Sequence, residues 1–182
     1  MSRKLKEIIK RERALYVPQA TTLKIRFMMW FSHEESYELF RWIKYMRKTE
    51  YYAKHARTIF GKIRCLLNGR KTNILGNRLG FFISPGCLGE NVKIFHKGDI
   101  IINYRSVIGE GCKLHGDNCI GNNGKDLDCP ILGKNVDVGV GAKIIGGVTI
   151  ADDIKIGANA VVTKSFLEPG ITIAGVPAKR IH

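Results

Sequence analysis

The sequence lacks an apolar run long enough to cross a bilayer, and its first residues, Met-Ser-Arg-Lys, include no apolar segment typical of a secretory signal. It also lacks the C-x-x-C spacing of structural zinc sites, because its five cysteines are scattered singly along 182 residues. An odd number of scattered cysteines does not suit a disulfide framework, so we predict reduced thiols. We therefore expect a cytoplasmic protein of one domain or of one domain with an extension.

Acidic residues are scarce in the first part of the chain. Residues 1–80 contain 19 Lys and Arg against 6 Asp and Glu, whereas residues 81–182 contain 11 against 10. The formal net charge of +14 therefore comes almost entirely from the first part. Such an asymmetry predicts an anionic partner, and we expect either peripheral contact with the inner face of a membrane or an acidic substrate. Nucleic-acid binding is not favoured, because no recognised nucleic-acid-binding module accompanies the charge.

Residues 1–80 are predicted to form a helical N-terminal part. One helix is expected from Lys4 to Leu15, ended by Val17-Pro18. The stretch Ser32–Glu35 fits the capping-box pattern S-x-x-E, and apolar residues at helical spacing follow it from Tyr37 to about Leu67. The sequence therefore predicts one long second helix, with Gly69 as its stop signal.

Residues 81–182 follow a different pattern, in which aliphatic residues recur every six positions. The downstream series is Leu132, Val138, Ile144, Ile150, Ile156 and Val162, and the upstream series is Leu88, Ile94, Ile100, Ile108, Leu114 and Ile120. The step from Ile100 to Ile108 is eight residues instead of six. A sustained six-residue period is typical of a parallel β-helix, in which three short faces make one coil and the aliphatic residues point inward.

The C-terminal stretch IGANAVVTKSFLEPGITIAGVPAKRI, together with the hexads, resembles the closing signature of the hexapeptide-repeat acyltransferases. Within that family the chain resembles the serine O-acetyltransferase-like branch, and more narrowly the short enzymes that acetylate capsular or lipopolysaccharide sugars. The resemblance implies a left-handed parallel β-helix over residues 81–182, a homotrimer with active sites between subunits, and acetyl-CoA as acyl donor.

The resemblance assigns a catalytic role to His96, because the residues around it reproduce the spacing of serine acetyltransferases around their catalytic histidine. Two departures accompany this match. The aspartate that pairs with the histidine in those enzymes would fall near Phe81-Phe82, and their second active-site histidine would fall at Cys129. These departures favour a sugar over serine as the acceptor.

Counting hexads predicts a second histidine beside the first. Ile94 and Leu114 are three hexads apart, so His115 should stack over Phe95 and lie near His96, since adjacent strands are about 4.8 Å apart. Imidazole suits the removal of a hydroxyl proton, because its ordinary pKa lies near neutral pH. We expect His96 to be the general base and His115 to be an oxyanion donor or an orienting group.

Further site residues are predicted less directly. Polar residues near the histidines are candidates for orienting His96 or for contacting the acceptor, and these are Asp99, Asn103, Asp117 and Asn122. The resemblance implies coenzyme A contacts at five further positions, which are Val140, Ala158, Thr163, Lys164 and Lys179. No metal is required by this chemistry.

The function that we predict is acetyl-CoA-dependent O-acetyl transfer to a sugar hydroxyl of a bacterial surface polysaccharide, such as capsule or lipopolysaccharide, or of its precursor. The first alternative is a serine or small-molecule O-acetyltransferase. The second is a zinc-dependent hydratase of the γ-carbonic anhydrase type, which needs three histidine ligands. The β-helical part has only His96, His115 and His182 to offer.

Overall fold

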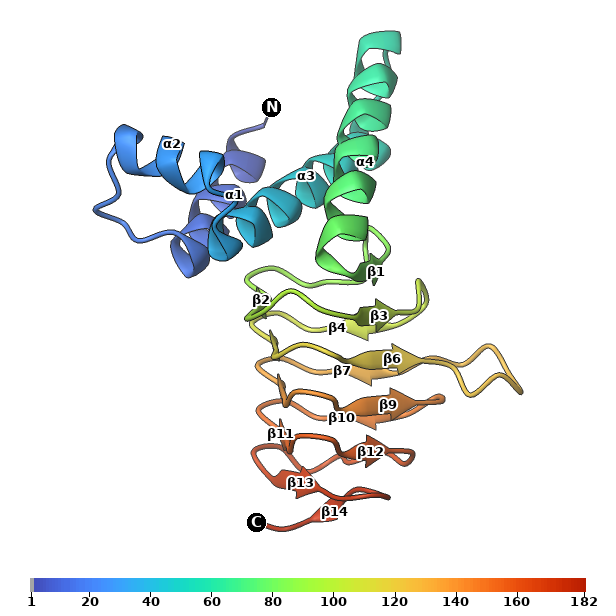
Figure 1. Cartoon of the computed structure of the whole chain (residues 1–182). Helices are drawn as coiled ribbons and strands as arrows, with labels where there is room; N and C mark the ends of the chain where they lie inside the picture. Colours follow the sequence, from blue (N-terminus) through green and yellow to red (C-terminus); the bar gives the residue numbers. More distant parts are fainter. Residues whose placement is uncertain (1) are drawn as a thin grey trace. The chain divides into compact units, whose positions relative to one another are not determined.

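The structure is a computed structural model that describes residues 2–182. The chain divides into two compact units, residues 1–79 and residues 80–182, so the boundary lies one residue from the predicted one. The first unit is helical, and the second consists of short strands wound into coils (Figure 1). In the part of the chain that the structure describes, no helix combines the length and the apolar character needed to span a membrane.

The helical unit contains four helices. They are α1 (Arg3–Tyr16), α2 (Leu23–Phe31), α3 (Glu35–His55) and α4 (Ile59–Leu79). The Oγ atom of Ser2 accepts a hydrogen bond from the amide of Leu5 and thereby caps α1. The helix ends at Tyr16, and Val17 is its extended C-cap directly before Pro18, where the sequence predicts the end.

The predicted single long helix is two helices. Ala56 is extended at the end of α3, and the Oγ1 atom of Thr58 accepts a hydrogen bond from the amide of Gly61, which starts α4. The side chain of Glu34, rather than that of Ser32, caps α3 by accepting a hydrogen bond from the amide of Tyr37. Helix α4 continues through Gly69, because a glycine inside a helix weakens it without ending it.

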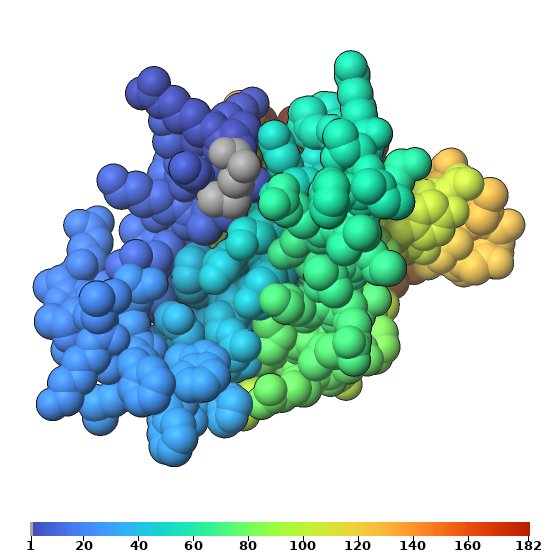
Figure 2. All heavy atoms as spheres, turned by 90° about the horizontal axis from the view of Figure 1, so that it is seen from above, coloured from blue at the N-terminus to red at the C-terminus, as the bar shows by residue number. Residues whose placement is uncertain are grey.

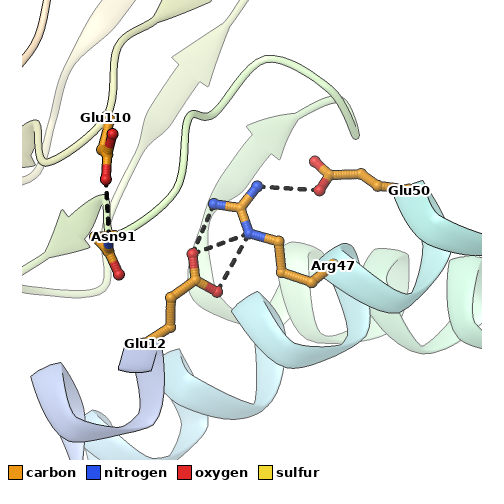
Figure 3. A network of polar contacts seen from close by, with 5 residues as sticks. All are labelled: Glu12, Arg47, Glu50, Asn91 and Glu110. Atoms are coloured by element: carbon orange, nitrogen blue, oxygen red, sulfur yellow. Dashed lines mark hydrogen bonds and ion pairs between the residues drawn. The ribbon is translucent and has the colours of Figure 1, made fainter. Parts of the chain in front are cut away.

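A buried ion pair joins α1 to α3. The guanidinium group of Arg47 lies between two carboxylates, at 2.8 Å from Glu12 and 3.0 Å from Glu50 (Figure 3). The side chains of Arg47 and Glu12 are almost fully buried, so each compensates a charge that would otherwise be costly inside the unit. Helix α2, in contrast, has no buried residue, and its side chains face outward at the rim of the helical unit (Figure 2).

The second unit is a left-handed parallel β-helix, as predicted, and its strands form three sheets along the coils (Figure 1). The first sheet contains β1 (Phe81–Ile83), β3 (Ile100–Ile102), β6 (Cys119–Gly121), β9 (Lys143–Ile145) and β12 (Val161–Val162). The second sheet contains β4 (Val107–Ile108), β7 (Ile131–Leu132) and β10 (Thr149–Ile150). The third sheet contains β2 (Lys93–Ile94), β5 (Lys113–Leu114), β8 (Asp137–Val138), β11 (Lys155–Ile156), β13 (Thr172–Ala174) and β14 (Lys179–Arg180).

The predicted aliphatic positions fill the interior of the β-helix. All twelve residues of the two hexad series are buried, with exposed fractions of 4% or less. They stack in columns, since Ile94 pairs with Leu114 and Leu114 pairs with Val138 on successive coils. Each coil thereby covers the apolar interior of the next, which no coil can do alone.

The eight-residue step lies between Ile94 and Ile102, whereas the sequence predicts it between Ile100 and Ile108. Ile102, not Ile100, pairs with Ile120 on the next coil, and it lies six residues before Ile108. The two additional residues therefore belong to the corner between Ile94 and Ile102, which contains His96. The sequence alone did not reveal this, because Ile100 and Ile102 are both buried aliphatic residues and either can keep the hexad phase.

We predict that the core columns dominate the stability of the β-helix. Replacing the buried Ile156 with Ala should lower the free energy of unfolding by about 2–5 kcal/mol, because the interior of a coil cannot collapse around the cavity. The change Lys155→Ala on the outward side of the same strand is the matched control and should cost less than about 1 kcal/mol. Urea denaturation of both variants measures the difference, and equal effects would contradict an inward-facing Ile156.

Candidate active site

The predicted histidines lie on one edge of the β-helix, where the third sheet turns into the first. We call this corner the histidine edge, and it comprises residues 95–99, 115–118, 139–142 and 157–160 on successive coils. His96 is an exposed residue in the longest of these turns. A Cβ atom added to Gly116 would lie 4.0 Å from the Cβ atom of His96, so these residues stack as the hexad count predicts.

His115 is held from two sides. Its ring stacks on that of Phe95 on the preceding coil, with centroids 4.4 Å apart and planes inclined by 9°. Its Nε2 atom lies 2.8 Å from a carboxylate oxygen of Asp137 on the following coil. Lys113 lies 3.7 Å from the other oxygen of Asp137 and adds an ion pair to the same carboxylate. The ring orientation of His115 is therefore fixed by stacking and by a charge-assisted hydrogen bond.

A buried asparagine shapes the turn beside His115. The side chain of Asn118 accepts a hydrogen bond from the amide of Gly116 and donates one to the carbonyl of Gly139 on the next coil. Only 1% of Asn118 is exposed, so both bonds are shielded from water. Gly116 has a φ of +113°, a conformation that L side chains rarely adopt. The turn after His115 is therefore specified by both residues.

The two predicted pantetheine positions lie farther along the same histidine edge. The amide of Asn159 donates a hydrogen bond to the carbonyl of Val140, which joins the turns that contain Val140 and Ala158. Gly139 must be small, since a Cβ atom there would lie 2.7 Å from the backbone nitrogen of Ala158. Both Val140 and Ala158 are exposed. One edge therefore presents the histidines and the exposed pantetheine positions in succession, about 4.8 Å per coil.

The predicted polar residues divide between two edges. Asp99 and Asp117 lie on the histidine edge, and the Nζ atom of Lys143 approaches Asp117 to 3.2 Å. Asn103 and Asn122 lie instead on the edge between the first and second sheets, so the expectation that Asn122 lies beside the histidines is wrong for a single chain. We call this second corner the loop edge, and it comprises residues 103–106, 122–130, 146–148 and 163–165.

Residues on the loop edge make local hydrogen bonds. The side chain of Asn103 accepts a hydrogen bond from the amide of Arg105, and that of Asn122 donates one to the carbonyl of Asp126. The long turn of residues 122–130 projects from the coil (Figure 1). Thr163 and Lys164, predicted to contact coenzyme A, share this edge and are exposed. Lys179 is exposed in β14, which pairs antiparallel with β13.

The structure also explains the two departures from the serine acetyltransferase pattern. Phe81 points into the β-helix and Phe82 is exposed on β1, so this strand supplies no carboxylate to a histidine. Cys129 lies in the long turn of the loop edge, where its thiol donates to the carbonyl of Leu127. The carboxylate partner of a histidine is instead Asp137, which lies on the coil after His115 rather than upstream of His96.

Sequence reasoning missed Asp137 as part of the site. The signal was present, because the hexad register that stacks Leu114 on Val138 also pairs Lys113 with Asp137. The register places Asp137 beside Lys113. It does not show that the ring of His115 reaches diagonally to the Asp137 carboxylate on the next coil. Such a contact depends on side-chain direction, whereas the repeat fixes only the backbone.

The thiol of Cys112, close to His115 in the sequence, is not suited to act as a nucleophile. Cys112, three residues before His115, is buried, and burial raises the pKa of its thiol to about 11. Among residues 2–182, no group of three or more His, Cys, Asp or Glu side chains is arranged to hold a metal ion. The histidine edge therefore offers imidazole and carboxylate groups for proton transfer at an exposed surface.

Comparison with known proteins identifies relatives of one kind. A serine acetyltransferase of Helicobacter pylori is 39% identical over 105 residues, which cover 56% of this chain and 61% of that protein. A serine acetyltransferase of Synechococcus elongatus is 32% identical over 106 residues, covering 57% of this chain and 43% of that protein. The chain thus spans less than two thirds of the length of these curated relatives, and no family model matches it.

Two solved structures show the same fold. Soybean serine acetyltransferase complexed with serine has a TM-score of 0.76 and 19% identity, covering 99% of this chain and 70% of the soybean chain. Serine acetyltransferase of Brucella abortus in complex with coenzyme A has a TM-score of 0.74 and 22% identity, covering 98% of this chain and 68% of that chain.

These comparisons correct the predicted acceptor. The matching relatives are serine acetyltransferases, so the prediction of a polysaccharide sugar hydroxyl as the acceptor is wrong. The departures at Phe81-Phe82 and Cys129 do not outweigh this similarity, and the carboxylate of Asp137 pairs with His115 rather than with His96. In sequence over 105 residues, and in fold over nearly its whole length, the chain is similar to serine acetyltransferases.

Proposed function

We propose that the chain is an acetyl-CoA-dependent serine O-acetyltransferase. The observation that carries this proposal is the 39% identity to the Helicobacter pylori serine acetyltransferase. The fold is also shared with one serine acetyltransferase complexed with serine and another in complex with coenzyme A. The histidine edge supports the same activity, because acid–base groups and the exposed residues predicted to contact pantetheine, Val140 and Ala158, lie along one edge.

In the proposed reaction, a carbon–oxygen ester bond forms to the serine hydroxyl while the carbon–sulfur bond of the thioester breaks. We assign His96 as the base that accepts the hydroxyl proton and later returns a proton to the departing thiolate. We propose direct transfer, and the buried thiol of Cys112 offers no nucleophile for an acetyl-enzyme intermediate. The thioester supplies an activated acetyl group, and the chain positions the two reactants.

His115 is the second histidine of the proposed site, and Asp137 is its positioning residue. The bond to Asp137 engages Nε2, so Nδ1 remains for the substrate. In the neutral ring Nδ1 orients the acceptor by accepting a hydrogen bond, and it donates to an oxyanion only when the ring carries a second proton. Asp99 and Asp117 bring negative charge to the same edge, which suits the ammonium group of serine. A role for Asn103 or Asn122 requires the loop edge of a second copy, in keeping with the proposed homotrimer.

The coenzyme positions remain as predicted from the family resemblance. Val140 and Ala158 are proposed to contact pantetheine along the histidine edge, and Thr163, Lys164 and Lys179 to lie near the adenosine and phosphates. Lysine ammonium groups suit phosphate as compact charges. Because Thr163 and Lys164 lie on the loop edge, one coenzyme molecule reaches all five positions only if it binds across the first sheet or between two copies.

We expect the purified protein to release free thiol from acetyl-CoA when L-serine is present and not when it is absent. The His96→Ala variant should lose about a hundredfold or more of this activity, because it removes the group assigned as the general base. The matched control is His55→Ala, which removes an exposed histidine from the helical unit and should retain full activity. Thiol release that does not depend on serine, or full activity of His96→Ala, would contradict the proposal.

We also expect Asp137→Asn to lower kcat by about tenfold or more, with little change in KM for serine, because the ring of His115 loses its orientation. In a His115→Ala background the same change should have almost no further effect, since the two residues act as a unit. Asp153→Asn is the control, because Asp153 accepts a hydrogen bond from Asn135 rather than from a histidine. Additive losses from His115→Ala and Asp137→Asn would show that Asp137 does not act through His115.

A further inference from the structure

A cleft in the helical unit gathers cations that the proposed acetyl transfer does not use. We call it the cation cleft, and its volume is about 310 Å³. Its lining residues are Tyr45, Lys48 and Tyr52 of α3 and Arg64, Leu67, Asn68 and Lys71 of α4. The cleft contains three cationic side chains, two phenol groups and an amide, and no carboxylate lines it.

Helical spacing explains why these side chains converge. Tyr45, Lys48 and Tyr52 are three and four residues apart, so they lie on one face of α3. Arg64, Asn68 and Lys71 follow the same spacing on α4. The two helices are neighbours in both views of the molecule (Figures 1 and 2), which present this contact from two directions.

A polar contact holds the two helices together beside the cleft. The hydroxyls of Thr49 and Thr72 are 3.3 Å apart and share a buried hydrogen bond. Gly69 faces this contact, and a Cβ atom there would lie 3.7 Å from the methyl group of Thr49, which is an ordinary van der Waals distance. The faces that line the cleft are therefore held on a packed helix pair rather than on a loop.

Three lysine ammonium groups in and around the cleft surround one aromatic ring. The ammonium groups of Lys44, Lys48 and Lys71 lie 5.3, 5.9 and 5.2 Å from the ring centroid of Tyr45. Among the described residues, none of these lysines forms an ion pair with a carboxylate, and neither does Arg64. The carboxylates nearest in sequence on α3 are engaged elsewhere, Glu38 by Arg41 and Glu50 by Arg47.

This concentration of like charge is unfavourable while the cleft holds only protein groups. Burial lowers the pKa of the Lys44 ammonium, and the charges of Lys48 and Arg41 lower it further. The pKa of Lys48 is likewise lowered, first by burial and then by the charge of Lys71. An anion in the cleft would relieve this repulsion and favour the charged form of each lysine.

We propose that the cation cleft binds a phosphate group, carried either by a soluble phosphate ester or by a lipid headgroup. A phosphate brings up to two negative charges and several acceptor oxygens to one point, which matches three converging cations better than a single carboxylate does. Arg64 offers a planar fork of donors and Lys48 and Lys71 offer compact charges. Tyr52 adds a neutral donor, as does the second amide hydrogen of Asn68, whose Nδ2 atom already donates to the carbonyl of Arg64. This binding site goes beyond the proposed acetyl transfer and does not depend on it.

The test compares thermal unfolding of the full-length protein in sodium phosphate and in sodium chloride at equal ionic strength. A second arm measures co-sedimentation with vesicles of phosphatidylcholine mixed with phosphatidic acid, against vesicles of pure phosphatidylcholine. The test variant is the double change Lys48→Gln and Lys71→Gln. Its matched control is Lys4→Gln with Lys24→Gln, which removes two exposed cations outside the cleft and leaves the same net charge.

We expect wild type and control to bind phosphate or the phosphatidic acid vesicles, and the test variant to bind about tenfold more weakly. If the test variant loses only the stabilisation by phosphate, the ligand is a soluble phosphate ester. If it loses only the binding to phosphatidic acid vesicles, the ligand is a lipid headgroup. Without ligand at low salt, the test variant should unfold no earlier than wild type, because a repulsion has been removed. If test and control variants behave alike in both arms, general electrostatics explains the binding and the proposal is overturned.

Discussion

The parallel hydrogen-bond ladder between successive coils is the constraint on which the β-helical unit depends. Each coil donates to and accepts from its neighbours at a fixed register, as when the amide of Phe95 donates to Leu114 and that of His115 donates to Val138. A residue therefore lies directly beside the residue one coil away, however far apart they are in sequence. Aliphatic columns fill the inside, and whatever side chains occur at a corner form a line on the outside.

The candidate active site follows from this constraint. The histidine edge combines groups from several coils: Phe95 and His96 from one, His115 and Asn118 from the next, and Asp137 from the one after. The carboxylate that a histidine needs can therefore come from a neighbouring coil as readily as from an upstream segment. The phenylalanines at positions 81 and 82 therefore do not argue against acid–base chemistry at this edge. The sugar acceptor, predicted from the resemblance to short sugar O-acetyltransferases, is contradicted by the serine acetyltransferase relatives.

Much of the fold was predictable, because a six-residue period has one structural meaning. The inward positions, the stacking of His115 on Phe95 and the boundary near residue 80 all follow from it. The place of the two additional residues did not, since Ile100 and Ile102 are both buried and only pairing with Ile120 distinguishes them. In the helical unit, the apolar spacing continued across the break at Ala56, because a short break between two helices need not change the phase of the apolar residues. The contact of His115 with Asp137 depends on side-chain direction, which the repeat does not encode.

The central claim is that one edge of the β-helix, from His96 to Ala158, binds the acyl donor and performs the transfer. The measurement that tests it most directly is a crystal structure of the protein with coenzyme A. We predict that the pantetheine arm lies along the histidine edge beside Val140 and Ala158, with its sulfur toward His96. Coenzyme A bound at the edge between the second and third sheets, away from both histidines, would contradict the account.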